Sequence, residues 1–409
     1  MKEFFKVKTI DQVLEYRSQF SSVHTEKISL TESVGRILAE DIQSDIDLPD
    51  FSRSIMDGFA VKGSSTFGAS EGNPAYLNVT GSIAMGESPN LTVGPGEAVR
   101  ISTGGMLPKG ADSVVMVEHT DAIDDITVEV YRSVAPGQNM IEVGEDIKKG
   151  ESILTCGRRI RPQEAGLLAA LGKSTLTVYK QPEIGIISTG DEIVSIDKVP
   201  GPGQIRDINT YTLLGLVEDM GAKATRFGIV GDDYKALLAT CSQALAQCDM
   251  VLVSGGSSVG ARDYTLDVIA AMEDSELLFH GISISPGKPT ILARVQKKAF
   301  WGLPGHVVSA MVVFSRIVTP FLEYISGSVD NSKNNIRLTA TLSRNVASAQ
   351  GRVDYIRIRL NQKEGVLWAE PVLGKSGLIS TMVKADGLVE IGMNTEGLDK
   401  GTQVEVILL

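Results

Sequence analysis

Two short segments combine hydroxyl, glycine and carboxylate residues directly after apolar, strand-like runs. Ser188-Thr189-Gly190-Asp191-Glu192 ends the run that starts at Ile184, and Ser254-Gly255-Gly256-Ser257 follows Met250–Val253. Glycine lets backbone N–H groups approach an anion closely, and Mg²⁺ prefers one or two carboxylates together with phosphate oxygens and water. These residue types therefore favour a site for a phosphate-bearing ligand and a hard divalent cation.

Both segments also allow a plainer interpretation. Asp191 and Glu192 are suited to capping a helix, and this alternative weighs equally. A flexible solvent loop is less favoured for the second segment, because six of the seven residues from Ser254 to Gly260 are small. Asp263, just beyond them, can complete a metal site or bond a nucleotide hydroxyl or a pterin N–H. The pattern is neither the dinucleotide-binding GxGxxG motif nor a Walker loop.

Three further segments carry weaker signals. Asp57 precedes a glycine and is more readily explained as a turn residue that accepts a local backbone bond. The segment Ile101–Gly105 can present backbone N–H groups to an anion or form a plain tight turn. Lys288 lies between a glycine and a proline in a stiff turn that suits an oxyanion, although a solvated turn lysine is an equal alternative. His306 is better explained as a polar residue at a helix start than as a ligand.

Composition and charge argue against several classes of protein. The 409 residues exceed one core of about 100–200 residues, so two to four domains are expected. A net charge of −11 argues against a general nucleic-acid binder and, weakly, against an anionic membrane surface. With four histidines, three cysteines and no HExxH or GxSxG motif, zinc and acyl-transfer chemistry have little support. We recognise no signal peptide and no apolar run of the ~20 residues that span a membrane, so we expect a cytoplasmic protein.

The order of the apolar runs predicts a multidomain fold of α/β and β type. A helix begins near Thr9, which forms a capping-box pattern with Gln12. Residues 181–327 alternate strands with helices and end in a long helix, Val307–Ile325. This alternation implies a parallel sheet covered by helices, with ligand sites at the carboxyl ends of its strands. Two other regions, 46–142 and 330–409, are rich in β-prone runs. These runs are Tyr76–Ile83, Glu97–Ser102, Ser113–Glu118 and Ile126–Val130 in the first region, and Ile336–Leu342, Val353–Leu360, Val366–Ala369 and Gln403–Leu408 in the second.

These segments, in this order and spacing, resemble the molybdopterin molybdenumtransferase family, which includes the bacterial molybdenum insertase and the matching module of gephyrin. Further matches extend along essentially the whole chain. They are Ala39–Ile42, Pro49–Ser52, Gly144–Asp146, Gly351-Arg352, Ser376-Gly377 and Ala385–Leu388. Each motif is weak alone, whereas their combination is highly specific.

The resemblance implies an enzyme that inserts molybdate into adenylylated molybdopterin, releases AMP and forms molybdenum cofactor. It also implies Mg²⁺ or another divalent cation, a homodimer with its site between the subunits, and molybdopterin adenylyltransferase as the upstream partner. Four domains per chain are implied: an N-terminal mixed dimerisation domain at 1–45 plus 143–180, a β-rich domain at 46–142, a three-layer α/β molybdopterin-binding domain with a parallel sheet at 181–327, and a C-terminal small β-barrel domain at 328–409.

Functional positions carry over from the family residue by residue. The acidic and hydroxyl positions expected to serve catalysis are Asp57, Thr103, Asp146, Glu192, Asp232 and Asp263. The expected substrate-binding positions are Ser188, Thr189, Gly190, Ser254, Gly255, Gly256, Ser257, Lys288, Pro304, Ser309, Arg352 and Ser380. The expected metal ligands are Asp191, Glu192 and Asp263.

Two departures from the family pattern leave alternatives open. The family commonly has a basic residue where Ser285 stands, and a proline where Val307 follows His306. A tungstate-preferring or catalytically weakened member is therefore one alternative, and a non-enzymatic scaffold is another. A nucleotide-processing enzyme that shares only the α/β domain is disfavoured, because Asp57 and Arg352 match outside that domain.

Overall fold

The computed structural model describes residues 7–255, 264–329 and 336–409. The chain forms two compact units. The larger comprises Met1–Glu40, Cys156–Ala165 and Thr175–Leu409, and the smaller comprises Asp41–Thr155 and Gly166–Ser174. The chain therefore passes from the larger unit into the smaller one twice, at Asp41 and again at Gly166.

A six-stranded sheet organises the larger unit. In spatial order its strands are β16 (Lys223–Val230), β13 (Glu183–Thr189), β17 (Met250–Ser254), β21 (Lys298–Leu303), β20 (Ile291–Val295) and β18 (Ser275–His280). The first four strands are parallel, which confirms the predicted parallel sheet. The last two run antiparallel at one edge, and the alternation of strands and helices did not predict them.

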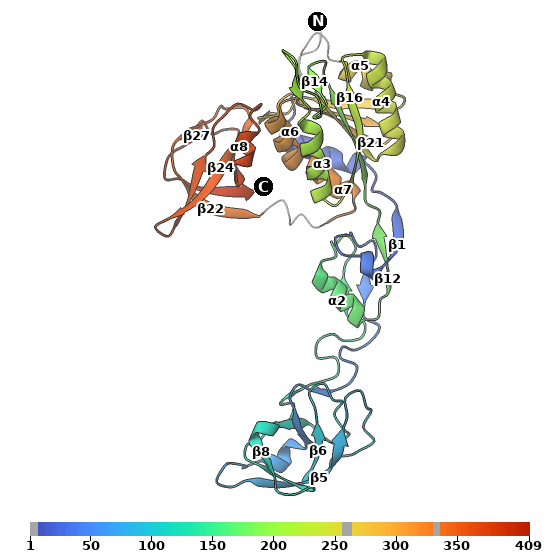
Figure 1. Cartoon of the computed structure of the whole chain (residues 1–409), viewed down its shortest axis with the longest axis vertical. Coiled ribbons are helices and arrows are strands. Elements are labelled where there is room, and N and C mark those ends of the chain that lie inside the picture. Colours follow the sequence, from blue (N-terminus) through green and yellow to red (C-terminus); the bar gives the residue numbers. More distant parts are fainter. Residues whose placement is uncertain (1–6, 256–263, 330–335) are drawn as a thin grey trace. The chain divides into compact units, whose positions relative to one another are not determined.

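Helices cover both faces of this sheet and complete three layers (Figure 1). One face packs against α4 (Tyr234–Gln247) and α5 (Thr265–Ala271), and the other against α3 (Asn209–Asp219) and the helix that follows β21. Central strands of a parallel sheet are buried on both sides and are therefore apolar throughout. In β13, Ile184 and Ile186 enter the core with α3, whereas Ile187 enters the core with α4.

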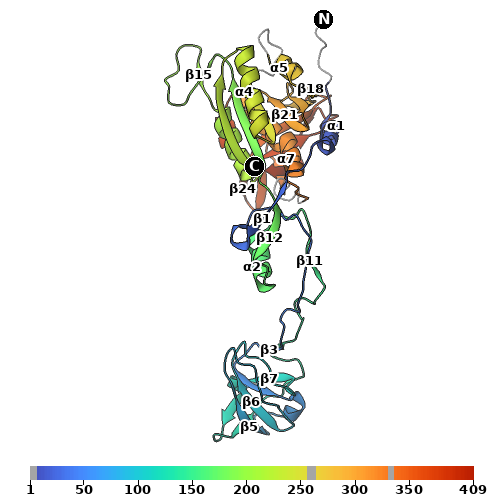
Figure 2. The same cartoon turned by 90° about the vertical axis from the view of Figure 1, so that its right-hand side faces the viewer.

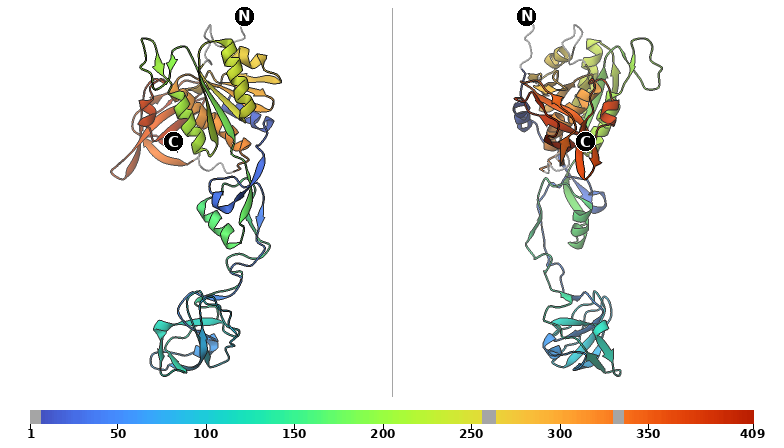
Figure 3. Two further views of the ribbon diagram at one scale, coloured as in Figure 1. Left: turned by 45° about the vertical axis from the view of Figure 1, so that its right-hand side comes forward. Right: turned by 90° about the vertical axis from the view of Figure 1, so that its left-hand side faces the viewer.

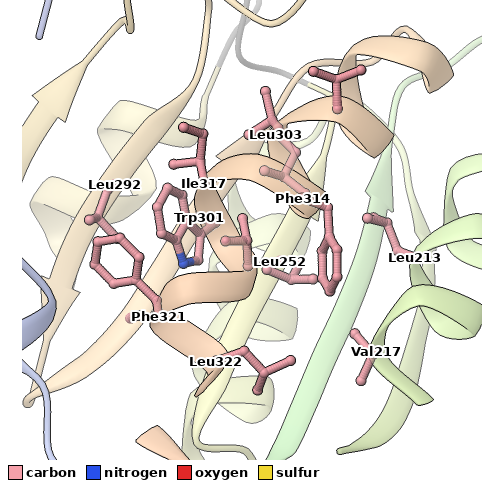
Figure 4. Packing of buried hydrophobic residues seen from close by; sticks show 14 of the residues in the cluster. Leu213, Val217, Leu252, Leu292, Trp301, Leu303, Phe314, Ile317, Phe321 and Leu322 are labelled. Atoms are coloured by element: carbon pink, nitrogen blue, oxygen red, sulfur yellow. The ribbon is translucent and has the colours of Figure 1, made fainter. Parts of the chain in front are cut away.

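The long helix predicted at Val307–Ile325 is present but contains a π-helical turn. It consists of α6 (Val307–Val313), the π-turn Phe314–Val318 and α7 (Thr319–Ile325). Its 19 residues and mean hydropathy of 1.4 match the length and composition of a membrane span, although the sequence showed no uninterrupted apolar run of that size. However, 67% of its most apolar window is buried inside the protein. Figure 4 shows the reason: Phe321 packs beside Trp301 of β21, and Phe314 lies towards Leu213 of α3, so the helix forms part of the core.

The C-terminal strands form the predicted barrel. They are β22 (Arg337–Leu342), β24 (Val353–Lys363), β25 (Val366–Pro371), β26 (Gly387–Ile391) and β28 (Gln403–Leu408), and pairing of β24 with β26 closes the barrel (Figure 3). A short strand before β20, β19 (Ile284–Ser285), pairs with β24, so the barrel is joined directly to the α/β part. Smaller barrel elements are β23 (Val346–Ala347), β27 (Gly397–Leu398) and α8 (Ser380–Val383).

Short elements complete the larger unit. The capping box of Thr9 and Gln12 is confirmed at α1 (Ile10–Glu15). Strand β1 (Thr25–Ser29) pairs with β12 (Thr175–Tyr179) beside the start of α2 (Pro162–Ala170). An excursion after β13 contains β14 (Ile193–Val194) and β15 (Ile205–Arg206) and projects from the sheet (Figure 2).

The smaller unit has a six-stranded β-sheet, as its β-prone runs predicted. In spatial order the strands are β7 (Ser113–Met116), β4 (Gly58–Val61), β6 (Glu97–Ile101), β5 (Ala75–Ile83), β9 (Thr127–Val130) and β8 (Thr120–Ala122). Two further pairs are β3 (Arg53–Ser54) with β10 (Met140–Ile141) and β2 (Ile42–Gln43) with β11 (Ser152–Leu154). Valine is the commonest side chain in its core, as expected for a paired sheet.

A buried carboxylate with two arginine partners, at the start of α2, generates a stability prediction. The Glu164 side chain is only 5% exposed and accepts hydrogen bonds from Arg158 and Arg161 at 3.0 Å. The hydrogen bonds of Arg161 lower the pKa of Glu164 to about 2, against the opposing effect of burial. A carboxyl whose pKa falls on folding stabilises the protein above its ordinary pKa, and this stabilisation disappears as the pH falls towards the folded value.

We therefore expect Glu164→Gln to lower the free energy of unfolding at pH 7 by about 1–3 kcal/mol. The difference from wild type should shrink as the pH approaches 3, in urea titrations at both pH values. Glu276→Gln is the matched control, because Glu276 is 55% exposed in its ion pair with Arg294 and should change stability by less than about 1 kcal/mol. A loss for Glu164→Gln that is the same at pH 3 and pH 7 would contradict the proposed electrostatic origin.

Candidate functional site

The carboxyl ends of the four parallel strands meet at one edge of the sheet. Strand β13 leads into Gly190, β16 into Gly231, β17 into Gly255 and β21 into Pro304. Because the strands are parallel neighbours, the turns that follow them are neighbours as well. This edge therefore gathers many of the expected positions: Ser188, Thr189, Gly190, Asp191, Glu192, Asp232, Ser254, Gly255 and Pro304.

Bare backbone is a steric requirement at this edge. Gly255 has a φ of +104°, and a Cβ there would lie 2.3 Å from the carbonyl oxygen of Thr189. The N–H of Gly255 donates to the carbonyl oxygen of Leu303 at 3.2 Å. A Cβ on Gly190, whose φ is +145°, would lie 2.7 Å from the carboxylate of Glu192. The turn after β17 thus packs against the backbone at the end of β13, whereas Gly190 gives room to the Glu192 carboxylate.

Exposed carboxylates lie beside this backbone. The Asp191 side chain accepts a hydrogen bond from the N–H of Asp232 at 2.9 Å, which joins the turns after β13 and β16. Asp191 therefore bonds to a neighbouring turn, whereas the helix that starts there, α4, is capped by Asp233. Within the described ranges, no three His, Cys, Asp or Glu residues converge as a metal site. Three expected positions, Gly256, Ser257 and Asp263, lie outside those ranges.

A buried polar network underlies the edge. The Ser188 hydroxyl donates to the Asp207 carboxylate at 2.9 Å and lies 2.9 Å from the Thr210 hydroxyl. The N–H of Thr210 donates to the same carboxylate at 3.1 Å. All three residues are buried, so the Ser188 side chain is engaged inside the protein and supports the edge from below.

A second buried contact joins two of the strand ends. The side-chain amide of Asn209 donates to the Ser254 hydroxyl at 2.6 Å and to the carbonyl oxygen of Gly305 at 2.8 Å. The sequence segment Gly203–Asn209, which contains Asp207 and Asn209, follows the Ser188–Glu192 segment, but sequence reasoning assigned neither residue a role and did not select Thr210. The available signal was Asp, Asn and Thr at the start of a predicted helix, but that pattern is also typical of ordinary helix capping.

The turn that carries Lys288 lies before β20 at the same edge. Its carbonyl oxygens accept from the N–H of Ile282 and from the Thr290 hydroxyl, at 3.0 Å and 2.7 Å respectively, so the turn is fixed by internal bonds. A Cβ on Gly287 would lie 2.4 Å from the Val313 side chain and 3.7 Å from the carbonyl oxygen of Ser309. Lys288 is exposed at this turn, whereas the expected position Ser309 is buried beneath it.

The barrel brings a second cation to this turn. Strand β19 precedes the Lys288 turn and pairs with the residues that follow Arg352. The Arg352 guanidinium lies 3.0 Å from the carboxylate of Asp354, which is 4% exposed. Burial raises the pKa of Asp354, but hydrogen bonds from Ser348 and Ser285, together with Arg352, outweigh this effect and hold the pKa below its ordinary value. Asp354 is therefore an anion that can orient Arg352.

The loop before α8 reaches the turn after β21. The Ser376 hydroxyl lies 2.8 Å from Nδ1 of His306, and the N–H of Val308 donates to the carbonyl oxygen of Ser376 at 3.1 Å. The expected position Ser380 begins α8 on this loop. Both barrel positions predicted from the sequence thus belong to segments that contact the sheet edge.

In the smaller unit, the structure brings two expected residues together. The Asp57 carboxylate accepts from the backbone N–H of Thr103 at 2.7 Å and from its hydroxyl at 3.2 Å. The partner is 46 residues away, so Asp57 does not make the local turn bond that seemed the simpler explanation. Both residues are exposed. Asp146 is also exposed, and its N–H donates to the carbonyl oxygen of Leu48.

A cavity of about 450 Å³ lies elsewhere in the larger unit. It is lined by α1, the π-turn, α7 and barrel strands, and includes Arg17, Glu323 and Tyr355. Burial raises the pKa of Glu323. None of the expected site residues lines this cavity, so it is separate from the strand-end edge.

Comparison with known proteins covers nearly the whole chain. Residues 8–172 match the MoeA N-terminal region (domain I and II), residues 185–324 a "Probable molybdopterin binding domain", and residues 339–409 the MoeA C-terminal region (domain IV). Proteins named molybdopterin molybdenumtransferase from Bacillus subtilis and Haemophilus influenzae are 32% and 33% identical, over 94% and 93% of this chain and 90% and 93% of theirs. The molybdopterin biosynthesis moeA protein from Pyrococcus horikoshii OT3 has a solved structure that is 32% identical, with a TM-score of 0.85 over 99% of this chain and 100% of that one.

The contact between Gly255 and Thr189 predicts a strong substitution effect. Gly255→Ala should lower the free energy of unfolding of the larger unit by about 2–5 kcal/mol, because the added Cβ meets a backbone oxygen that cannot move away. Gly35→Ala is the control: its φ is +87°, but a Cβ there has no heavy atom within 4 Å, so only the cost of positive φ, about 1–2 kcal/mol, should appear. If urea unfolding showed the same loss of unfolding free energy for Gly255→Ala and Gly35→Ala, the predicted clash between the added Cβ and the Thr189 carbonyl oxygen would be contradicted.

Proposed function

The chain belongs to the MoeA family of molybdopterin molybdenumtransferases, and we propose that it inserts molybdate into adenylylated molybdopterin, releasing AMP and forming molybdenum cofactor. One observation carries the proposal. The turns after the parallel strands combine backbone bare of side chains, at Gly190 and Gly255, with the exposed carboxylates Asp191 and Glu192. Such an edge suits a large ligand that carries phosphate groups.

Different residues bind different parts of the two substrates. The backbone of the turns containing Gly190 and Gly255 receives the adenylylated pterin, because glycine there lets the strand ends pack closely and present backbone groups at the edge. Lys288 and Arg352 attract the molybdate oxyanion, since the Lys288 turn is paired through β19 to the strand that Arg352 precedes. The proposed catalytic set is Asp57, Thr103, Asp146, Glu192, Asp232 and Asp263, and the other proposed substrate-binding positions are Ser188, Thr189, Ser254, Gly256, Ser257, Pro304, Ser309 and Ser380.

A divalent cation, Mg²⁺ being the simplest choice, fits the donor set. Asp191 and Glu192 are adjacent exposed oxygen ligands, and Asp263 would join them. Mg²⁺ needs only one or two protein carboxylates when substrate phosphates and water supply the rest. When bound, the cation offsets the repulsion between these carboxylates and the substrate phosphates. The Asp191 side chain is already oriented by its hydrogen bond from Asp232.

The assembly and setting of the enzyme follow from the family resemblance. We propose a cytoplasmic homodimer whose site takes residues from both subunits, with molybdopterin adenylyltransferase supplying the substrate. The four-domain division at 1–45 plus 143–180, 46–142, 181–327 and 328–409 belongs to the same proposal. The scaffold and the tungstate-preferring or weakened enzyme are not favoured, since the relatives are named as transferases.

Turnover tests the activity directly. Purified protein with adenylylated molybdopterin, Mg²⁺ and molybdate should release AMP, whereas Asp57→Ala and Asp263→Ala should each lose at least about 100-fold of the rate while remaining folded. Asp125→Ala is the control in the smaller unit, because Asp125 is exposed outside the proposed site and should keep full activity. AMP release that is equal with and without the wild-type protein would end the proposal.

Mixed dimers test whether the site is shared. Asp57→Ala and Asp263→Ala subunits, co-expressed with different tags, should form heterodimers with one intact and one doubly altered site. Such heterodimers should recover about half of the wild-type rate, although each parent homodimer is inactive. If both residues act within one chain, the heterodimer will be as inactive as its parents.

A further inference from the structure

Two buried polar side chains at the start of α3, Asp207 just before the helix and Asn209 at its first residue, lie beneath the strand-end edge. Asp207 accepts from the Ser188 hydroxyl and from the N–H of Thr210, which fixes the start of the helix to the end of β13. Asn209, two residues later, is 7% exposed and bonds to the ends of two other strands. Residues 207–209, which lead into α3, therefore contact the ends of β13, β17 and β21.

The Asn209 amide joins two turns that are otherwise held by backbone contacts. It donates to Ser254, the last residue of β17, at 2.6 Å, and to the carbonyl oxygen of Gly305, just after β21, at 2.8 Å. The same turns approach closely: a Cβ on Gly305 would lie 3.7 Å from the Cα of Gly255. The amide has two N–H donors, and these two acceptors use both of them.

We propose that Asn209 is a positioning residue for substrate binding. Its amide sets the separation between the Ser254-Gly255 turn and the Pro304-Gly305 turn, and thereby holds the bare backbone where the phosphate-bearing substrate binds. This inference rests on the proposed function, because it assigns Asn209 to that same site. Loss of the amide leaves the Gly305 carbonyl oxygen without this donor, so the turn is free to shift.

Two substitutions separate hydrogen bonding from space filling. Asn209→Asp keeps the volume and shape of the side chain but cannot donate to the Gly305 carbonyl oxygen. Asn209→Ala removes both bonds. Leu213→Ala is the structural control: Leu213 is fully buried on the same helix, in the apolar core, so this variant destabilises α3 without touching either turn.

Affinity for adenylylated molybdopterin, titrated in the full-length protein with Mg²⁺ but without molybdate, is the decisive measurement. Both Asn209 variants should raise the Kd about tenfold, while kcat at saturation changes less than about threefold. Leu213→Ala should lower the Tm but leave the Kd within about twofold of wild type. A wild-type Kd in Asn209→Asp, or an equal loss of affinity in Leu213→Ala, would overturn the positioning role.

Amide hydrogen exchange keeps this inference separate from the proposed function. In Asn209→Ala, peptides covering residues 303–308 should exchange faster than in wild type, whether or not the wild-type protein turns over substrate. If wild type releases no AMP, the proposed function fails while exchange still decides whether Asn209 holds the turn. Unchanged exchange in Asn209→Ala would refute the link between Asn209 and the turn even in an active enzyme.

Discussion

Contact of backbone with backbone, at the ends of three parallel strands, is the constraint on which the rest of the larger unit depends. Gly255 lies so close to the Thr189 carbonyl that no Cβ fits between them, and its N–H bonds to Leu303 of the next strand. This approach places the strand ends in register and leaves their turns without side chains. The helices that follow these strands begin at the same edge of the sheet, so their first residues lie close to the turns. The apolar core on both sheet faces supplies the rigidity that maintains this arrangement.

The barrel is coupled to this edge by a short paired strand and a buried charge. Strand β19 pairs with β24, and Asp354 at the start of β24 bonds to Ser285, Ser348 and Arg352. The family resemblance implies a basic residue at the position of Ser285, and a basic side chain there would compete with Arg352 for the same carboxylate. In this chain the Ser285 hydroxyl instead donates to Asp354, and the carboxylate pairs with Arg352. Relative to the expected pattern, this turn has one positive charge fewer, while Asp354 still orients Arg352.

The sequence predicted most elements because their signals are local. The apolar runs of β13 and β17, the capping box at α1 and the strands of the barrel all follow from neighbouring residues. The antiparallel strands β18 and β20 were not predicted, since an apolar run carries no information about strand direction. Likewise, the π-turn has no distinct periodic pattern. The bond between Asp57 and Thr103 spans 46 residues, so only the fold brings these two side chains together.

Hydroxyl-rich turns were the strongest sequence signal, and the structure changes what that signal means. Ser188 and Ser254 were expected to face a ligand, yet both are buried and bond to Asp207, Thr210 or Asn209. Buried hydroxyls need partners, and the first turn of α3 supplies them. Recognition at the edge then falls to backbone groups, exposed carboxylates and the Lys288 turn. Backbone groups cannot rotate away from a ligand as side chains can, so their positions must be set before binding. A buried polar network beneath glycine-rich turns provides that preorganisation. The entropy lost in ordering the turns is therefore lost during folding and not again when a ligand binds.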